Sequence, residues 1–359
     1  MGSSPPRLEL SAKLPPSPAG GEPSLERYLS PAGPRAVSMD DTAAAVTLAR
    51  LCGLEVSPFR LHLLTLRGFH LPAYKGSVFR GGFGQIFREI SCVTRAQSCA
   101  GCRNAAHCGY CAVFETPVLP GQSGVLTKYT NAPHPFLLLP PLDGRTYLPV
   151  GARLAVDVTL IGPARRWFPQ FLFVFDELGR RGNYGGPYRI DQATSLADGQ
   201  VLFDGAARKI LADPPCVSWT KPAQTVHRIA VEFVTPLRMR TDGRYNSAPD
   251  FVAFVHALLG RLHLLTSLYA GQPSQRDWMR DLLARADHIR TESAEFHPFH
   301  WERTSGRQQR SISMDGVLGR FTAVGDLTPF LPALHAGELL HAGSGTSMGM
   351  GKHRFRLES

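Results

Sequence analysis

One order of secondary-structure patterns occurs twice in this 359-residue chain, and this repetition constrains the fold more than any other feature. Each occurrence reads strand, helix, two strands, helix, glycine-rich loop and strand, as judged from apolar periodicity and turn residues. The first occurrence has these patterns at 58–66, 77–90, 136–139, 154–161, 166–178, 179–187 and near Tyr188. The second has them at 227–234, 251–269, 309–314, 319–324, 329–340, 342–351 and 352–357.

This order is typical of the split β-α-β, or ferredoxin-like (RRM-like), layout, an α+β fold in which helices cover one face of an antiparallel sheet. Its repetition predicts two such domains in tandem. We expect an N-terminal domain over 58–225, with a cysteine-bearing insertion at 98–112, and a C-terminal domain over 226–359. The segment 1–57 is expected to form a Pro/Ser/Gly-rich mobile tail followed by a short helix from Asp40 to Leu51.

Four of the seven cysteines form two C-x-x-C pairs with five residues between them. The four are Cys99, Cys102, Cys108 and Cys111. Four thiolates at this spacing can surround one tetrahedral ion, so the pattern predicts a metal site, with zinc favoured over an iron–sulfur cluster. Four protein thiolates leave no open position for a substrate, so we expect the ion to be structural and not catalytic. Cys52, Cys92 and Cys216 are expected to be ordinary thiols.

The second glycine-rich loop, AGSGTSMGMGK, does not fit the common nucleotide-binding motifs. Gly345 stands six residues before Gly351, one residue too far for a P-loop, and His353 replaces the required Ser or Thr after Lys352. Glycines do allow a backbone to approach a ligand closely, and basic side chains follow the loop. The pattern favours contact with RNA; packing of the loop on its own helix is the alternative.

The chain is basic, with 39 Lys and Arg against 29 Asp and Glu, for a net charge of +10. Residues 58–115 alone hold seven basic and two acidic side chains. This excess suits a polyanionic partner such as nucleic acid; a basic chain selected for solubility is the alternative. A hydrophobic content of 43% excludes wholesale disorder and allows about two domains with cores.

The sequence favours a cytoplasmic protein. Its longest apolar stretch, 251–270, is interrupted by His256, Arg261 and His263, so no membrane span is expected. The first ten residues, MGSSPPRLEL, lack the apolar core of a secretory signal. An odd number of cysteines, four of them clustered, does not resemble a secreted disulfide framework.

Several motifs occur together in an order that resembles a known family. They are the stretch YKGSVFRGGFG from Tyr74, the two C-x-x-C pairs, His134-Pro-Phe with Pro140-Pro141, Gly179 to Tyr188, VTPLR from Val234, RTSGRQ from Arg303, Gly316 to Gly319, PFLPAL from Pro329, His341 and GTSMGMGK. Over about residues 58–357, the chain resembles the CRISPR precursor-RNA processing endoribonucleases of the RAMP superfamily.

The resemblance implies tandem ferredoxin-like domains that bind CRISPR repeat RNA, or guide RNA, and cleave it within the repeat. The reaction implied is metal-independent attack of a ribose 2′-OH on the adjacent phosphate, which gives a 2′,3′-cyclic phosphate and a 5′-OH. The alternative is a non-catalytic RAMP subunit that binds RNA in a CRISPR effector complex, beside other effector subunits. A zinc hydrolase is disfavoured because a four-cysteine site is closed.

The implied reaction needs a base for the 2′-OH, a cation for the phosphorane and an acid for the leaving oxygen. We expect His70 as the base, Lys75 as the charge stabiliser and Tyr74 as the orienting group or acid, because all three lie between the first strand and the first helix. Histidine suits proton transfer because its pKa lies near about 6.5. A solvated loop residue is the alternative reading of His70.

Other residues compete for these roles or for RNA contact. His297 and His300 form a rival pair, and His341 and His353, which flank the glycine loop, are a third choice. Candidate RNA contacts, each also readable as a solvated or packed residue, are Arg67, Arg80, Arg88, Arg303, Arg307, Arg310, Gly345, Gly349 and Lys352.

Overall fold

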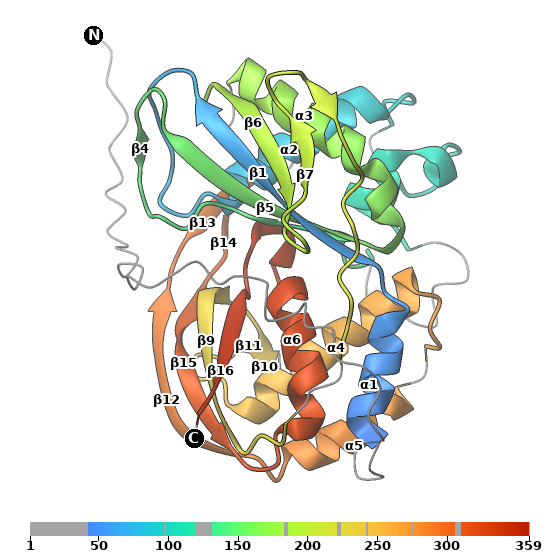
Figure 1. Ribbon diagram of the computed structural model, residues 1–359, viewed down its shortest axis with the longest axis vertical. Helices are drawn as coiled ribbons and strands as arrows, with labels where there is room; N and C mark the ends of the chain where they lie inside the picture. The colour runs from blue at the N-terminus through green and yellow to red at the C-terminus, as the bar shows by residue number, and fades with distance from the viewer. Residues whose placement is uncertain are drawn as a thin grey trace.

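Each half of the chain folds into an antiparallel sheet with helices on one face, and the two halves are stacked end to end (Figure 1). This computed structural model describes residues 42–96, 98–118, 126, 131–182, 186–220, 224–241, 243–274, 276–305 and 310–358. The predicted tail up to residue 41 lies outside the described residues, as does Arg307. The backbone of Arg310 is described, but its side chain is not.

The N-terminal sheet has the strand order β3-β5-β1-β6-β7-β8, all antiparallel. Its first four strands with helices α2 and α3 make the ferredoxin-like layout, and β7 and β8 extend one edge. The elements are β1 (Val56–Thr65), α2 (Gly76–Ser91), β3 (Phe136–Leu139), β5 (Arg153–Ile161), α3 (Phe168–Arg181), β6 (Tyr188–Ser195), β7 (Val201–Asp204) and β8 (Lys209–Ile210). Two short strands, β2 (Phe69–His70) and β4 (Tyr147–Leu148), pair beside this sheet.

The C-terminal sheet repeats the order as β12-β15-β9-β16. Two hairpins and one extra helix are added to the basic layout. The elements are β9 (Arg228–Leu237), the hairpin β10 (Arg240–Thr241) with β11 (Arg244–Tyr245), α4 (Phe251–Tyr269), α5 (Asp277–Ala286), β12 (Arg290–Phe299), the hairpin β13 (Glu302–Ser305) with β14 (Arg310–Ser313), β15 (Gly316–Val324), α6 (Leu331–Leu340) and β16 (His353–Leu357). The tandem ferredoxin-like arrangement predicted from the sequence is thus observed.

One strand of the second repeat was predicted in the wrong place. The segment 309–314 was expected to pair in the sheet, but β14 pairs only with β13, and β12 takes the place beside β15. The apolar pattern of the sequence does not reveal β12, because most of its side chains are exposed. Only its last residue, Phe299, is buried. Helix α5 was not predicted either.

Helix α1 (Thr42–Cys52) confirms the predicted short helix and belongs to the C-terminal core. It packs against α5 and α6, and Leu51 and Leu54 join the same apolar cluster as Phe251 and Leu334. The chain therefore crosses from this core into the first sheet only at β1, as the blue segment in Figure 1 shows.

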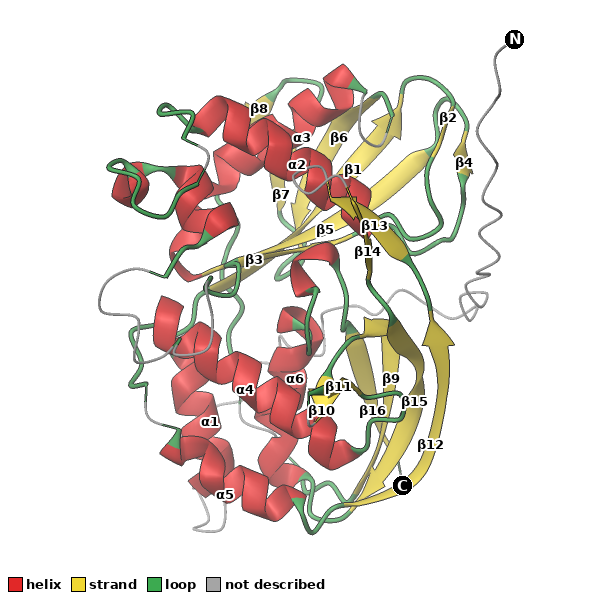
Figure 2. Ribbon diagram, turned by 180° about the vertical axis from the view of Figure 1, so that it is seen from behind, coloured by secondary structure: helices red, strands yellow, loops and turns green. Residues whose placement is uncertain are grey.

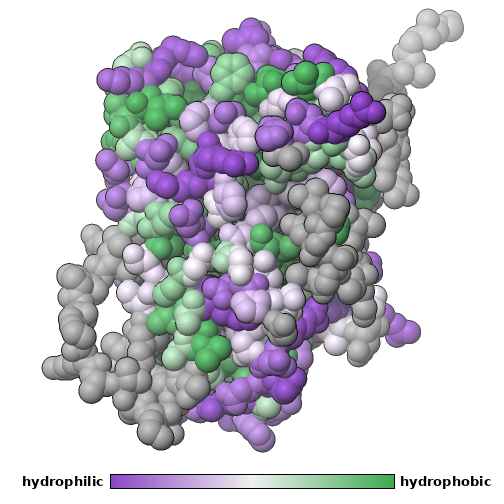
Figure 3. Space-filling model, turned by 90° about the vertical axis from the view of Figure 1, so that its right-hand side faces the viewer, coloured by the Kyte–Doolittle hydropathy of each residue, from purple (hydrophilic) through white to green (hydrophobic). Residues whose placement is uncertain are grey.

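Helix α4 is, by length and composition, the one candidate membrane span among the described residues, and half of that window is buried inside the protein. Arg261 and His263 on this helix are buried, and the Arg261 guanidinium donates to the Leu340 carbonyl of α6. On the face shown in Figure 3, hydrophilic and hydrophobic patches are interspersed. These features fit a core helix.

A small apolar cluster joins the two domains. Tyr74 contributes from the N-terminal domain, and its ring packs against Trp301 at 4.9 Å and Phe299 at 6.2 Å between ring centroids. The remaining buried members, Met314, Met348 and Met350, come from the C-terminal domain. We call this set the junction cluster. It fixes the loop before α2 against the link between β12 and β13.

Candidate functional site

The glycine loop lies packed between the domains. Its short helical turn, Thr346–Met348, contacts β3 and α2, and Tyr74 Oη donates to the Met348 carbonyl over 2.8 Å. Gly349 has a φ of 84°, and an added Cβ there would meet Leu138 and Pro140. The alternative considered for this loop was packing on its own helix; it packs instead on the other domain. Gly349 is buried and Gly345 is half-buried, so little loop backbone faces outward.

Tyr74 and Lys75 are both buried and bonded. Lys75 is fully buried, and its ammonium donates to the Ala73 carbonyl at 3.2 Å and to Asp143 Oδ1 at 3.4 Å. Burial lowers the pKa of Lys75, while Asp143 partly offsets that effect. Burial raises the pKa of Tyr74 well above its usual value. These contacts suit residues that hold the junction, and the predicted catalytic roles of both stay predictions.

His70 is exposed at the end of β2, where its ring packs on Tyr147 with 5.0 Å between centroids. Arg67 is exposed in the turn just before β2. The segment that carries His70 runs directly into Tyr74 and hence into the junction cluster. His70 is therefore the one member of the predicted catalytic trio that solvent, or a substrate, can reach.

A second exposed histidine, His300, lies in the chain segment that contributes Phe299 and Trp301 to the junction cluster. His300 follows β12 and stands between the buried residues Phe299 and Trp301. Its Nδ1 is 3.0 Å from Asp315 Oδ1, and 76% of its side chain is exposed. Ser313 Oγ donates to the other carboxylate oxygen of Asp315 over 2.5 Å. The pKa of Asp315 is lowered by the Ser313 hydroxyl, by His300 and by the charge of Arg238.

Arginines surround Tyr245 next to this pair. The guanidinium carbons of Arg238 and Arg240 lie 4.2 and 4.6 Å from the Tyr245 ring centroid, and both groups donate to its hydroxyl. Arg303 is half-buried, and burial together with Arg238 lowers its pKa. No ion pair to a carboxylate is observed for these three arginines among the described residues. We call His300, Asp315, Arg238, Arg303 and Tyr245 the junction surface.

The other predicted residues are engaged elsewhere. Arg80 donates to Ser347 Oγ at 3.1 Å and lies 2.9 Å from His134 Nε2, so it braces the glycine loop. Lys352 donates to the Glu338 carbonyl at 2.5 Å. His341 and His353 are buried in the core. His297 is exposed beside Glu295, and Arg88 donates to the Ala96 carbonyl.

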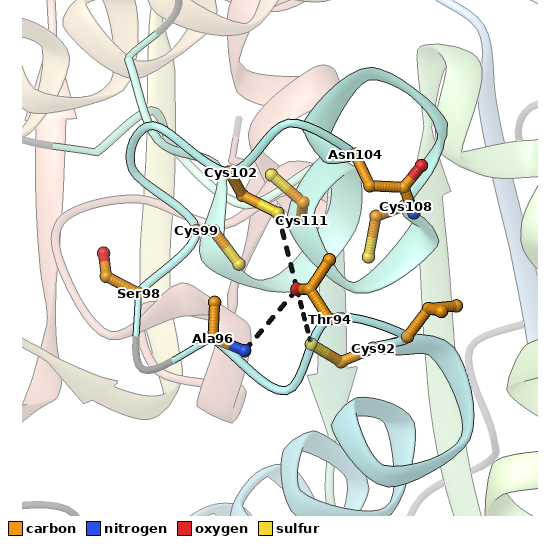
Figure 4. A pocket seen from close by; sticks show the side chains of 10 residues that line it. Cys92, Thr94, Ala96, Ser98, Cys99, Cys102, Asn104, Cys108 and Cys111 are labelled. Carbon is orange, nitrogen blue, oxygen red and sulfur yellow. Dashed lines mark hydrogen bonds between the residues drawn. The ribbon is translucent and has the colours of Figure 1, made fainter.

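The four clustered cysteines line one small pocket together with Cys92, Thr94 and Asn104 (Figure 4). Cys99 and Cys102 lie in the segment after α2, Cys108 directly follows the short helical turn Ala105–His107, and Cys111 lies in the turn Tyr110–Glu115. Burial, together with the neighbouring Cys111 and Glu115, raises the pKa of Cys99 to about 12. Such a set of mutually repelling thiolates is one that a bound cation would stabilise.

These thiols do not stand as a formed coordination shell. In the part of the chain that the structure describes, no group of three or more His, Cys, Asp or Glu side chains is arranged to hold a metal ion. The donor set suits zinc in kind and number, but the predicted metal insertion is not shown and stays a prediction.

Comparison with known proteins places this architecture in a family. Residues 231–353 match the family model of the CRISPR-associated endoribonuclease Cas6. The C-terminal domain therefore belongs to the Cas6 family. Residues 54–215 match a second family model, described as an N-terminal domain. The resemblance inferred from the sequence motifs is thus confirmed.

One curated protein and several solved structures are similar to this chain over most of its length. An uncharacterized protein of Archaeoglobus fulgidus is 25% identical over 296 residues, covering 80% of this chain and 93% of the relative. A Thermus thermophilus Cas6 product complex superposes with a TM-score of 0.51 at 17% identity, over 84% of this chain and all of that one. A partial Cas6-RT-Cas1–Cas2 complex gives a TM-score of 0.50 at 11% identity, over 85% of this chain and 46% of its own. The structural likenesses establish the Cas6 fold.

Sequence patterns did not reveal most of the junction surface. Arg238, Tyr245 and Asp315 lie in links and hairpin ends, where periodicity carries no information about function. His300 was predicted as one of a pair with His297, and Arg303 as an RNA contact. What brings these residues together is the β10–β11 hairpin and the link between β14 and β15, and neither is visible as a site in one sequence.

Proposed function

We propose that this Cas6-family protein cleaves precursor CRISPR RNA within its repeats, by metal-independent attack of a ribose 2′-OH on the adjacent phosphate. The observation that carries the proposal is the Cas6 match of the C-terminal domain, combined with exposed histidines, His70 and His300, in the two chain segments that enter the junction cluster. The Thermus relative is a product complex, which supports RNA as the ligand.

The proposed chemistry needs groups that move protons and groups that hold a phosphate. His70 is the proposed general base, because it is exposed and lies on the segment that leads into the junction cluster. Tyr74 and Lys75 hold that segment in place. Arg67, Arg238, Arg240 and Arg303 supply positive charge for the RNA backbone.

Purified protein is expected to cleave its cognate repeat RNA in the presence of EDTA. A single 2′-deoxy substitution at the scissile nucleotide should abolish cleavage, because it removes the nucleophile while the phosphate stays. The products should carry a cyclic phosphate and a 5′-OH that polynucleotide kinase labels without prior phosphatase treatment. Gel separation of labelled RNA measures both results.

The competing candidate is a non-catalytic RAMP subunit that binds repeat RNA in an effector complex. Its support is that one solved structure of this fold is a partial Cas6-RT-Cas1–Cas2 complex. If the protein binds repeat RNA tightly but does not cleave it at pH values around neutrality, the proposed endonuclease activity is contradicted and this candidate is supported. A cytoplasmic location is part of either proposal.

We also propose that the four clustered cysteines hold one structural metal ion, zinc before an iron–sulfur cluster. The support is that four sulfurs from two C-x-x-C pairs line one pocket. A closed shell of four thiolates would hold the insertion in place next to α2 and would supply no group to the reaction.

Elemental analysis is expected to find one zinc per chain. Cys99→Ser and Cys108→Ser should lose the metal and lower the melting temperature of the protein, whereas Cys52→Ser, at an exposed cysteine outside the pocket, should change neither. Iron with visible charge-transfer absorption would assign a cluster instead. The site is contradicted if wild-type protein, purified with its cysteines kept reduced, contains no metal.

A further inference from the structure

The proposed reaction requires an acid for the leaving oxygen, and Tyr74, predicted as the orienting group or acid, is not placed to supply it. Tyr74, the sequence candidate, donates its hydroxyl proton to the Met348 carbonyl and is buried. We propose that His300 is the general acid of the reaction and that Asp315 is its positioning residue. This inference rests on the proposed ribonuclease function and assigns a role within it.

The geometry around His300 defines its protonation. A carboxylate accepts hydrogen bonds and donates none, so the 3.0 Å contact with Asp315 requires a proton on His300 Nδ1. Nε2 is then the ring nitrogen directed away from the carboxylate, on a side chain that is 76% exposed. Asp315 is itself fixed by Ser313. An adjacent fixed carboxylate orients an imidazole and selects its tautomer.

Two other side chains act on the Asp315 carboxylate of this pair: Ser313 of β14, and Arg238, which directly follows β9. Arg303 of β13 lies near Arg238. Arg238 is also tied to the glycine loop, since Ser344 Oγ donates to its carbonyl at 2.9 Å. The guanidinium group of Arg238 thus lies near the acid and can bind a phosphate, and Arg303 adds a second guanidinium group near Arg238.

The site stands on a rigid base. Phe299 and Trp301, the neighbours of His300, and Met314, the neighbour of Asp315, are buried in the junction cluster. Tyr74 packs on the first two from the N-terminal domain. The exposed pair is therefore fixed relative to the segment that carries His70, as proton-transfer groups acting on one phosphate must be. The β13–β14 hairpin lies where the domains meet, as both ribbon views show (Figures 1 and 2).

The proton balance of the step is simple. The 2′-oxygen forms a bond to phosphorus as its proton passes to His70, and the bond between phosphorus and the 5′-oxygen breaks. His300 Nε2 gives its proton to that departing oxygen, which leaves as a 5′-OH. Arg238 and Arg303 offset the charge of the phosphorane. Exchange with water afterwards restores a neutral His70 and a protonated His300.

The test compares two repeat RNAs that differ at one atom, a 5′-bridging oxygen or a 5′-bridging sulfur at the scissile phosphate. A thiolate leaves without protonation, so only the oxygen substrate needs a general acid. We expect His300→Ala to lower single-turnover cleavage of the oxygen substrate about 10²-fold. The same variant should cleave the sulfur substrate at close to the wild-type rate, with unchanged RNA affinity.

Further variants separate the roles. Asp315→Asn should lower the oxygen rate about tenfold and leave the sulfur rate unchanged, which a merely structural role would not produce. His70→Ala should lose about 10²-fold on both substrates, as expected of the base. His256→Ala, at an exposed histidine on α4, is the matched control and should change neither rate.

An equal loss on both substrates in His300→Ala, or an unchanged oxygen rate, would overturn the assignment. Loss of RNA binding in this variant would overturn it as well, because the residue would then serve recognition. Wild-type protein that binds both RNAs and cleaves neither contradicts the proposed ribonuclease itself, an outcome distinct from failure of the His300 assignment.

Discussion

Replacing Gly76 by alanine is expected to lower the free energy of unfolding by about 3 kcal/mol. Gly76 is buried at the first turn of α2, where a Cβ would clash with the Met348 carbonyl and with the ring of Tyr74. Neither neighbour can yield easily, because the same carbonyl accepts the Tyr74 hydroxyl and belongs to a loop wedged between the domains. The added methyl therefore forces the domains apart or breaks that hydrogen bond.

The same helix offers a matched control. Gly81 is exposed on α2, and a Cβ there would meet nothing within 4 Å. Gly81→Ala should raise the free energy of unfolding by about 0.7 kcal/mol, since alanine favours a helix over glycine. Urea unfolding followed by circular dichroism measures both changes. If the two substitutions shift stability in the same direction, the tight junction contact at Gly76 is contradicted.

The contrast between these two glycines shows what one sequence can and cannot reveal. Both sit in the same motif, FRGGFG after YKGSV, and helical periodicity predicts α2 around them almost to its observed ends. Only the position of the other domain makes one of them irreplaceable. The tandem fold was predictable for this reason: local periodicity determines its helices and most strands, and the repeated order determines the layout.

The site was less predictable because it depends on contacts between distant segments. His300, Asp315 and Arg238 lie up to 77 positions apart in the sequence, and a hairpin, a link and a strand end bring them together. Tyr74 and Lys75 stand in a recognisable motif, yet both are buried, and a single sequence does not reveal that burial. A motif indicates which residues a fold depends on, and exposure separates those residues from the ones that can touch a substrate.

Acidification is expected to begin to destabilise the protein at pH values well above those at which its carboxylates take up protons. Burial holds the pKa of His353 to about 4 and that of His134 to about 3, and it lowers the pKa of His341 well below its usual value. In the unfolded chain each would titrate near about 6.5. These histidines thus add stability that is fully present above pH 6.5 and is lost progressively as the pH falls, because only the unfolded chain binds the protons.

From the pKa of His353, about 2 kcal/mol should be lost between pH 7 and pH 5, and His134 should contribute a similar amount. His353 lies among Phe233, Phe254 and Gly337, with its Nε2 buried and unpaired and its Nδ1 3.3 Å from the Gly351 carbonyl. His353→Leu removes the titrating group and leaves no unpaired nitrogen, so it should be nearly neutral at pH 7 and reduce the acid loss by about 2 kcal/mol.

The matched variant His353→Gln keeps a donor for the Gly351 carbonyl but cannot take up a proton in this range. It should be less stable than wild type at pH 7, because a longer amide fits this aromatic surrounding poorly, yet it should show the same reduced pH dependence as His353→Leu. Urea unfolding at pH 7, 6 and 5 separates the two effects. The difference between variant and wild type in the free energy of unfolding at pH 7 reports packing, and the slope of that free energy against pH reports the protons bound on unfolding. An unchanged slope in both variants would contradict this prediction. It would mean that His353 binds its proton in the folded protein as readily as in the unfolded chain.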